Sequence, residues 1–292
     1  MSSFMLFPIC ASYCTLSRVS AEAPIWEDAQ SEQFHIPPCV PDVTITLSSA
    51  SELPAPEGDF LGRRGEKRVW RSPERITRQT QDMFRSCPHL SVSYAPGRAQ
   101  EVRAIARADC WRWATRASFL WPGLSLPQLL LPFHTLVFHA SYVAHDGGAL
   151  LFTAPSGTGK STQAELWRVQ RGARVLNGDK AAVRLSGAPT AHGMPFSGTS
   201  GICENVSLPL RGVVVLSQAK ENTVRRLGPS AAVAALGENV FADRSIAEEW
   251  SAALNLLLDL AASVPVYALA CTPDERAVCA LEEAMARERR EV

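Results

Sequence analysis

The clearest chemical signal in the sequence is a run of nine consecutive residues: Ala154, Pro155, Ser156, Gly157, Thr158, Gly159, Lys160, Ser161 and Thr162. After its first position, the run matches the pattern G-x-x-x-x-G-K-[ST] of a phosphate-binding loop. In that pattern, glycines let backbone N–H groups wrap the phosphates, Lys160 reaches the β- and γ-phosphates, and the Ser161 hydroxyl holds Mg²⁺. The run therefore predicts a site for a nucleoside triphosphate, with ATP and Mg²⁺ as the expected cofactors.

The segments on either side of the run are those that such a loop requires. Residues 150–153 form an apolar strand, and residues 161–171 form a helix that Gly172 ends. Ala154 occupies the position of the first template glycine, and we expect strain there if the backbone needs a positive φ. The alternative interpretation is a glycine loop that binds no ligand.

A phosphoryl transfer also needs a second carboxylate, which completes the metal site or accepts the proton of an attacking hydroxyl. Asp179 is the best candidate because it follows the short apolar run Val175-Leu176, 18 residues after Ser161. This spacing places it on a strand beside the loop. The alternative is an Asn-Gly-Asp turn with a solvated carboxylate. Lys180 follows Asp179, whereas an AAA-type or motor ATPase would be expected to show a longer apolar run ending in Asp-Glu.

Composition limits the classes of partner. The chain has 292 residues, of which 46% are hydrophobic and 20% charged, and its 29 basic and 29 acidic residues cancel. Nothing global therefore favours nucleic acid or an anionic membrane as a partner. No run approaches the roughly 20 apolar residues of a membrane helix. The eight cysteines lack metal-site spacing and predict reduced thiols in the cytoplasm: Cys10, Cys14, Cys39, Cys87, Cys110, Cys203, Cys271 and Cys279.

Two domains are expected, with the boundary near Leu126. Residues 1–125 lean toward β-structure, with alternating runs at 43–47 and 90–94 and an apolar start, residues 1–16, that we interpret as a buried strand. Residues 126–292 alternate strands and helices, which predicts an α/β domain. Its expected strands are 137–144, 149–153, 174–176, 181–185, 212–216 and 265–271, and its later helices are 245–262 and 273–290.

A basic stretch is the one notable feature of the first domain. It comprises Arg63, Arg64, Lys67, Arg68, Arg71, Arg75 and Arg78, with Trp70 inside. The simpler interpretation is a solvated hairpin and helix face. The other is a surface on which an acidic substrate docks.

Three segments together resemble a known family. His139-Ala140-Ser141, the run from Ala154 to Ser161, and Asn177-Gly178-Asp179 look like the catalytic domain of HPr kinase/phosphorylase and its relatives, and more distantly like ATP-dependent phosphoenolpyruvate carboxykinase. The resemblance covers roughly residues 130–275. It implies a P-loop kinase domain with a mixed sheet and flanking helices, preceded here by the smaller β-rich domain.

The resemblance also implies roles for individual residues. Lys160 and Ser161 would bind phosphate and Mg²⁺, Asp179 would be the general base, and His139 would belong to the active site, although a histidine on an apolar strand is by itself more often a core residue. Glu204 would be a further metal ligand, but Gly201-Ile202-Cys203-Glu204-Asn205 departs from the family's signature. The alternative for Glu204 is an ordinary exposed acid in a loop. The departure from the signature also puts in doubt a phosphorylase activity and the use of HPr as substrate.

The sequence therefore predicts an ATP- and Mg²⁺-dependent kinase that phosphorylates a hydroxyl, with a serine of a protein or peptide as the first candidate acceptor. One alternative is an ATP-binding regulatory or maturation partner that phosphorylates no acceptor. Another is a small carboxykinase-like enzyme. The acceptor, the nucleotide preference and the oligomeric state, a homo-oligomer included, are left open.

Overall fold

The computed structural model of the chain describes residues 3–9, 12–18, 33–34, 40–81, 87–198 and 200–291. The chain divides into two compact units. Unit 1 comprises Met1–Phe133 together with Ala242–Ala252, and unit 2 comprises His134–Phe241 and Ala253–Val292. Each unit contains one eight-stranded sheet with helices, so the protein is of the mixed α/β class.

The sheet of unit 1 has the order β1-β2-β3-β8-β7-β6-β5-β4. Its strands are β1 (Ser3–Ile9), β2 (Ser12–Arg18), β3 (Val43–Ala50), β4 (Asp59–Arg64), β5 (Lys67–Arg71), β6 (Ile76–Gln81), β7 (Pro88–Ala95) and β8 (Arg98–Arg107). β3 pairs in parallel with β2 and β8, and the other neighbours are antiparallel. Buried Val43, Ile45 and Leu47 alternate along β3 as the sequence pattern predicts.

The apolar start of the chain forms two strands where one was expected. β1 and β2 pair antiparallel, and the residues that join them, like the side chains of both strands, lie outside the described part. A series of short helices follows β8, namely η1 (Ala108–Cys110), α2 (Trp111–Ala114), α3 (Ala117–Gly123), α4 (Leu126–Leu130) and η2 (Leu131–Phe133). They bury Trp111, Leu120 and Trp121 and complete the chain of unit 1 before residue 134.

The basic stretch forms the predicted hairpin, since β4 and β5 pair antiparallel, but the expected helix face is wrong, because the stretch continues into β6 and its last member is buried. The Arg78 side chain is 2% exposed, and its Nη2 lies 2.7 Å from Glu249 Oε2 and 3.3 Å from Asp243 Oδ2. The Tyr94 hydroxyl donates to Glu249 Oε1 at 2.8 Å. A buried guanidinium needs such partners, and two acidic residues more than 160 positions along the chain supply them.

The sheet of unit 2 is built around β9 (Thr135–His145). Its order is β10-β9-β12-β13-β14-β16-β15, with β11 against β9 and an additional parallel pairing between β10 and β14. The other strands are β10 (Gly148–Thr153), β11 (Arg174–Asn177), β12 (Lys180–Arg184), β13 (Thr190–Gly193), β14 (Ser207–Gln218), β15 (Thr223–Arg226) and β16 (Val266–Cys271). The hairpin between β9 and β10 turns at Asp146 and Gly147, whose φ angles are 51° and 72°.

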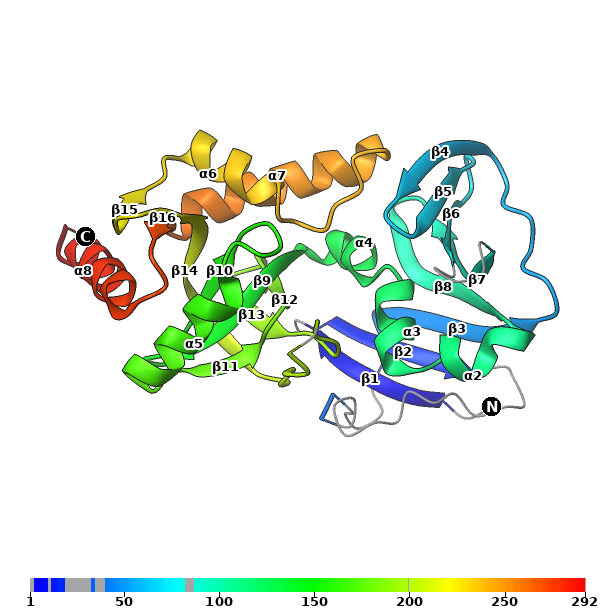
Figure 1. Ribbon diagram of the computed structural model, residues 1–292. Helices are drawn as coiled ribbons and strands as arrows, with labels where there is room; N and C mark the ends of the chain where they lie inside the picture. The colour runs from blue at the N-terminus through cyan, green and yellow to red at the C-terminus, as the bar shows by residue number, and fades with distance from the viewer. Residues whose placement is uncertain are drawn as a thin grey trace. The chain divides into compact units, whose positions relative to one another are not determined.

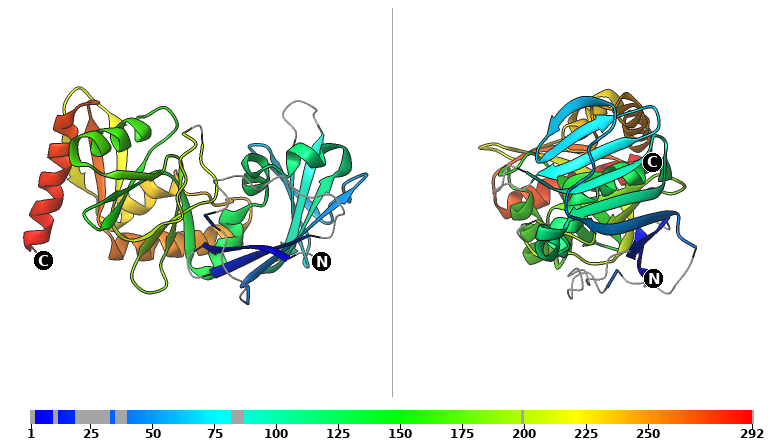
Figure 2. Two further views of the ribbon diagram at one scale, coloured as in Figure 1. Left: turned by 90° about the horizontal axis from the view of Figure 1, so that it is seen from below. Right: turned by 90° about the vertical axis from the view of Figure 1, so that its right-hand side faces the viewer.

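Four helices accompany this sheet: α5 (Lys160–Arg171), α6 (Pro229–Gly237), α7 (Ala247–Ser263) and α8 (Glu275–Glu291). α5 ends as predicted at Gly172, whose φ of 64° is favourable for glycine. Figures 1 and 2 show α5 and the later part of α7 on opposite faces of the sheet. Ala164 and Trp167 of α5 pack with Phe152 of β10 in one buried cluster, so the helix is fixed directly against the strand that precedes the glycine loop.

One histidine of unit 2 makes stability depend on pH. His192 on β13 is 7% exposed, its Nδ1 lies 2.7 Å from Ser207 Oγ, and its Nε2 is buried without a hydrogen-bond partner. Burial, with Arg184 nearby, lowers the pKa of His192 from 6.5 to about 4. The neutral imidazole is therefore the form that the fold accepts.

We predict that unit 2 loses stability as the pH falls from about 6.5 to about 4, because the unfolded chain then binds a proton on His192 that the folded chain refuses. Above that window the histidine is neutral in both states. The shift corresponds to roughly 3 kcal/mol in total. Urea unfolding at pH 7 and pH 4.5 should show that His192→Asn flattens this dependence, whereas His134→Asn, at an exposed histidine, leaves it unchanged. An unaltered slope in the His192 variant would contradict the assignment.

Candidate functional site

The predicted site residues meet at the middle of β9. On one side, Thr153, the last residue of β10, pairs with Ala140, and its hydroxyl donates to the carbonyl of His139 at 2.9 Å. On the other side, Lys180, the first residue of β12, pairs with His139. The glycine loop, which follows β10, and the turn that precedes β12 therefore flank His139 and Ala140 of β9 from opposite sides.

The glycine loop has the backbone that its sequence requires. Gly157 and Gly159 have φ angles of 79° and 122°, and a Cβ at either would meet no atom within 4 Å. The surrounding protein leaves room for a side chain at both positions, so the backbone conformation is what requires glycine in the fold. The φ angle of Ala154 is not positive, so the backbone strain considered for an alanine at this position does not arise. Its methyl group is fully buried in the cluster that contains Phe152 and Trp167.

A cavity of about 280 Å³ lies between the loop and the turn, lined by His139, Ser156, Gly157, Gly159, Lys160, Ser161, Thr162, Gly178, Asp179 and Ser200. It brings together eight of the residues that the sequence singled out. Ala154, Pro155 and Thr158 belong to the loop but do not line the cavity. Gly178 and Ser200 line it and were not selected from the sequence.

Asp179 carries the strongest electrostatic signal in the cavity. Its Oδ1 lies 3.1 Å from His139 Nε2, and its Oδ2 accepts a hydrogen bond from the ammonium of Lys180. These interactions, first of all the hydrogen bond from His139, hold the pKa of Asp179 well below its usual range, although partial burial opposes them. The carboxylate is therefore ionised at any ordinary pH, which suits a cation or the orientation of a hydroxyl better than it suits a strong base.

Asn177 places Asp179. The sequence singled out the Asn-Gly-Asp segment but assigned no role to the Asn177 side chain. The side chain is fully buried, and its Oδ1 accepts the N–H groups of Asp179 and Lys180, both at 2.9 Å. Its Nδ2 donates to the carbonyls of Met194 and Phe196 at 3.3 and 3.0 Å. The available signal was an asparagine before a glycine, since asparagine can bond to the backbone two residues ahead and so form a turn.

Lys160 is bound to its own loop. The side chain is 7% exposed, and Nζ donates to the carbonyls of Ala154 at 2.9 Å and Pro155 at 3.3 Å. Burial lowers the pKa of this ammonium, and the nearby Asp179 acts in the opposite direction. Lys160 is also the first residue of α5, so the positive end of that helix and the ammonium both face the cavity.

Glu204 is the predicted metal ligand that the structure does not bring to the cavity. Its carboxylate forms an ion pair with Arg174, and it is not one of the cavity-lining residues. Its backbone is nevertheless attached to the site, because Glu204 N donates to Leu176 O at 2.8 Å and Cys203 forms a β-bridge with Asn177. Among the residues described, no group of three or more His, Cys, Asp or Glu side chains is arranged to hold a metal ion. A metal role for Glu204 stays a prediction.

By its fold, unit 2 is an α/β domain in which a glycine-rich loop joins a strand to a helix. The family described as SynChlorMet cassette protein ScmC matches residues 128–285, and the chain belongs to that family. Among solved structures, the Hpr(Ser) kinase/phosphatase from Coxiella burnetii is similar at 14% identity and a TM-score of 0.30, over 53% of this chain and 90% of that one. No curated protein matches the chain. None of the helices in the described ranges combines the length and hydropathy needed to span a membrane.

We predict that Ala154→Gly lowers the free energy of unfolding by about 1–2 kcal/mol, because it removes a buried methyl group and adds freedom to the unfolded chain. The glycine that the loop pattern prefers is therefore the less stable choice here. Chemical denaturation measures the effect. Ala188→Gly, at an exposed loop alanine, is the control and should change stability by less than about 0.5 kcal/mol. Equal losses in both variants would mean that the Ala154 methyl contributes nothing specific.

Proposed function

We propose that the chain is an ATP- and Mg²⁺-dependent kinase that transfers the γ-phosphoryl group to a hydroxyl, with a serine of a protein or peptide as the first candidate acceptor. One observation carries the proposal: the glycine loop with Lys160 and the ionised Asp179 line the same cavity. The name of the ScmC family specifies no activity, so the proposal rests on this cavity and on the sequence pattern of the loop.

The groups in the cavity fit a triphosphate. Gly157 and Gly159 leave open space where a side chain would stand, so phosphate oxygens can approach the backbone N–H groups closely. The Lys160 ammonium and the start of α5 add positive charge at the same place. Lys160 must exchange its two carbonyl acceptors for phosphate oxygens, which are charged and therefore stronger acceptors.

The same cavity offers the ligand types that Mg²⁺ prefers. The Ser161 hydroxyl and the Asp179 carboxylate are hard oxygen donors, and Mg²⁺ is commonly held by one or two carboxylates together with substrate phosphates and water. When bound there, Mg²⁺ would neutralise charge on the phosphates. Glu204 would have to leave Arg174 before it could contribute.

Asp179 is the residue that would direct the acceptor. The acceptor oxygen forms a bond to the γ-phosphorus, the bond from that phosphorus to the bridging oxygen of the nucleoside diphosphate breaks, and the acceptor proton passes to Asp179. Because the transition state of phosphoryl transfer is loose, the proton moves late, and a weak base that orients the hydroxyl is sufficient. His139 would act through Asp179 as a positioning residue, since its Nε2 holds Oδ1.

A second function is favoured by the ion pair between Lys180 and Asp179. A carboxylate that is already bound by both Lys180 and His139 has less capacity to receive a proton. A protein whose loop binds ATP to set its conformation, as a regulatory or maturation partner, would need no such base. The two functions differ in whether labelled γ-phosphate ever appears on another molecule.

We predict that Lys160→Ala weakens ATP binding by about 10- to 100-fold, because a charge-assisted contact to the phosphates contributes roughly 1.5–3 kcal/mol. Isothermal titration calorimetry with Mg-ATP measures this. Arg168→Ala removes a cation from the exposed face of the same helix, where it pairs with Glu165, and should leave the affinity unchanged. A folded Lys160 variant with wild-type affinity would contradict the phosphate-binding role of the loop.

We predict that a substitution at Asp179 slows phosphoryl transfer far more than it weakens Mg-ATP binding. Asp179→Asn keeps the shape of the side chain and leaves Mg-ATP binding nearly intact, but phosphoryl transfer should fall by about 100-fold or more. The assay is mass spectrometry of serine- and threonine-containing peptides and small hydroxyl compounds after incubation with Mg-ATP. Partial rescue at high Mg²⁺ would identify Asp179 as mainly a metal ligand.

Two outcomes of this assay would contradict the kinase function. The first is full transfer activity of the Asn variant at ordinary Mg²⁺, which would leave Asp179 as a turn residue. The second is a wild-type protein that binds Mg-ATP and modifies no acceptor in the set, which would favour the regulatory function.

A further inference from the structure

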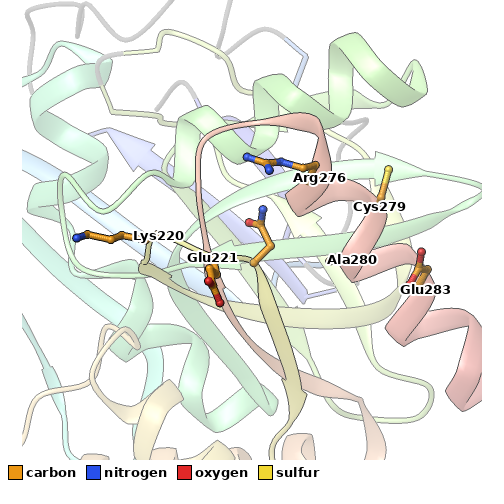
Figure 3. A pocket seen from close by; sticks show the side chains of 7 residues that line it. Lys220, Glu221, Arg276, Cys279, Ala280 and Glu283 are labelled. Carbon is orange, nitrogen blue, oxygen red and sulfur yellow. The ribbon is translucent and has the colours of Figure 1, made fainter.

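Unit 2 contains a second cavity, of about 360 Å³, that the proposed reaction does not use. It is lined by Lys220, Glu221, Asn222, Arg276, Cys279, Ala280 and Glu283. The first three lie between β14 and β15, whereas the others lie on α8, which follows β16. Figure 3 shows the labelled side chains of both groups around the cavity. The cavity therefore lies between two connections that leave neighbouring strands of the sheet.

These connections leave the same edge of the sheet as the glycine loop. β10 pairs in parallel with β14, and β14 pairs in parallel with β16, so the carboxyl ends of all three strands point the same way. The glycine loop follows the first of them, and the two sides of the second cavity follow the other two. In open α/β sheets, ligands bind outside the carboxyl ends of the strands.

Gln218 connects the two places. It is the last residue of β14, and its Nε2 lies 3.4 Å from Gly157 O and 3.5 Å from Thr158 O in the glycine loop. Lys220, two residues further on, already lines the second cavity. Gln163 in the first turn of α5 is joined to Cys271, the last residue of β16, by a contact of 3.3 Å between Nε2 and Sγ. On the β14 side the cavity thus begins two residues beyond a contact with the glycine loop, and on the β16 side it begins five residues beyond a contact with the first turn of α5.

Hydrogen bonds hold the two sides of the second cavity together, and most of its lining side chains are polar. Asn222 holds its two sides together, because Nδ2 donates to Thr272 Oγ1 at 2.9 Å and Oδ1 accepts Thr272 N–H at 3.0 Å. The carboxylates of Glu221 and Glu283 can accept hydrogen bonds from ribose hydroxyls or an exocyclic amine, and Arg276 can donate to ring nitrogens.

Volume supports a division of the ligand between the two cavities. Small-molecule pockets usually measure about 300–1,000 Å³, and the cavity at the glycine loop, at about 280 Å³, lies just below that range. The second cavity, with about 360 Å³, lies within that range and can hold the remainder of a nucleotide.

We propose that this second cavity binds the nucleoside part of the triphosphate whose phosphates occupy the glycine loop. The inference rests on the proposed function, because it assigns the other half of the same ligand. Gln218 then lies beside the junction of the two halves. The base is held by hydrogen bonds without aromatic stacking, since none of the lining residues is aromatic.

Alkylation of Cys279 tests the proposal without any substitution. The thiol is half-buried, lines the cavity and accepts a hydrogen bond from Arg171 Nη2 at 3.3 Å. Mg-ATP at ten times its Kd should slow iodoacetamide labelling of Cys279 by about tenfold, whereas tripolyphosphate should slow it by less than about twofold. Cys87, half-buried in unit 1 and also bonded to an arginine, is the internal control and should be unaffected by either. Equal labelling rates with and without ATP would overturn the proposal.

A cavity-filling variant gives a second test. Ala280→Trp occupies the cavity and should weaken Mg-ATP binding by at least about tenfold, while the affinity for tripolyphosphate stays within about twofold of wild type. Ala286→Trp, at an exposed alanine of α8 outside the cavity, should change neither affinity. If Ala280→Trp does not fold, the surface double variant Lys220→Ala/Arg276→Ala replaces it, with Arg287→Ala as its control.

The two ligands distinguish failure of this inference from failure of the proposed function. Wild-type protein that binds ATP and tripolyphosphate, combined with an Ala280→Trp variant that binds both equally well, overturns the nucleoside site alone. Wild-type protein that binds neither ligand contradicts the proposed function, and the nucleoside site falls with it.

Discussion

The amide of Asn177 controls the geometry of the candidate site. The chain that runs beside β9 as β11 and β12 is interrupted at Gly178 and Asp179, and such an interruption leaves backbone groups without ladder partners. The buried side chain of Asn177 accepts hydrogen bonds from the N–H groups of Asp179 and Lys180. It also donates hydrogen bonds to the carbonyls of Met194 and Phe196, in a segment further along the chain. The break therefore has a fixed shape, and Asp179 emerges from it beside His139. The ion pairs of Asp179, and with them its low pKa, depend on this position.

The elements nearest the loop could be predicted because their signals are local. The strand–loop–helix around Ala154 to Arg171, the hairpin at Asp146-Gly147 and the end of α5 at Gly172 each depend on a few adjacent residues. The predicted α7 and α8 agree with the structure within two residues at each end. α6, β13 and β15 were missed, because short segments take their structure from the sheet or the core that they join and not from a strong pattern of their own.

Long-range pairings were beyond sequence reasoning. The basic stretch has few acidic neighbours in the sequence, yet Arg78 pairs with Asp243 and Glu249, more than 160 residues later. Glu204 could be named as a metal ligand only through a resemblance, and nothing local indicates that it pairs with Arg174, 30 residues earlier. The spacing of Asp179 from Ser161 predicted a strand beside the loop, but Asp179 lies in the turn between β11 and β12. The buried amide that orients this turn could not be identified without the carbonyls of Met194 and Phe196.

The discontinuity of unit 1 has a consequence for synthesis of the chain. Its second segment, Ala242–Ala252, contains both carboxylates that surround Arg78, and more than 100 residues of unit 2 separate it from the first. Domains commonly fold in the order in which they leave the ribosome, the first one before the next. Here the strands that carry Arg78 emerge long before their counter-charges, so unit 1 cannot be completed until most of unit 2 has been made. A fragment that ends at Phe133 would therefore lack both carboxylates that pair with Arg78, however well its sheet is formed.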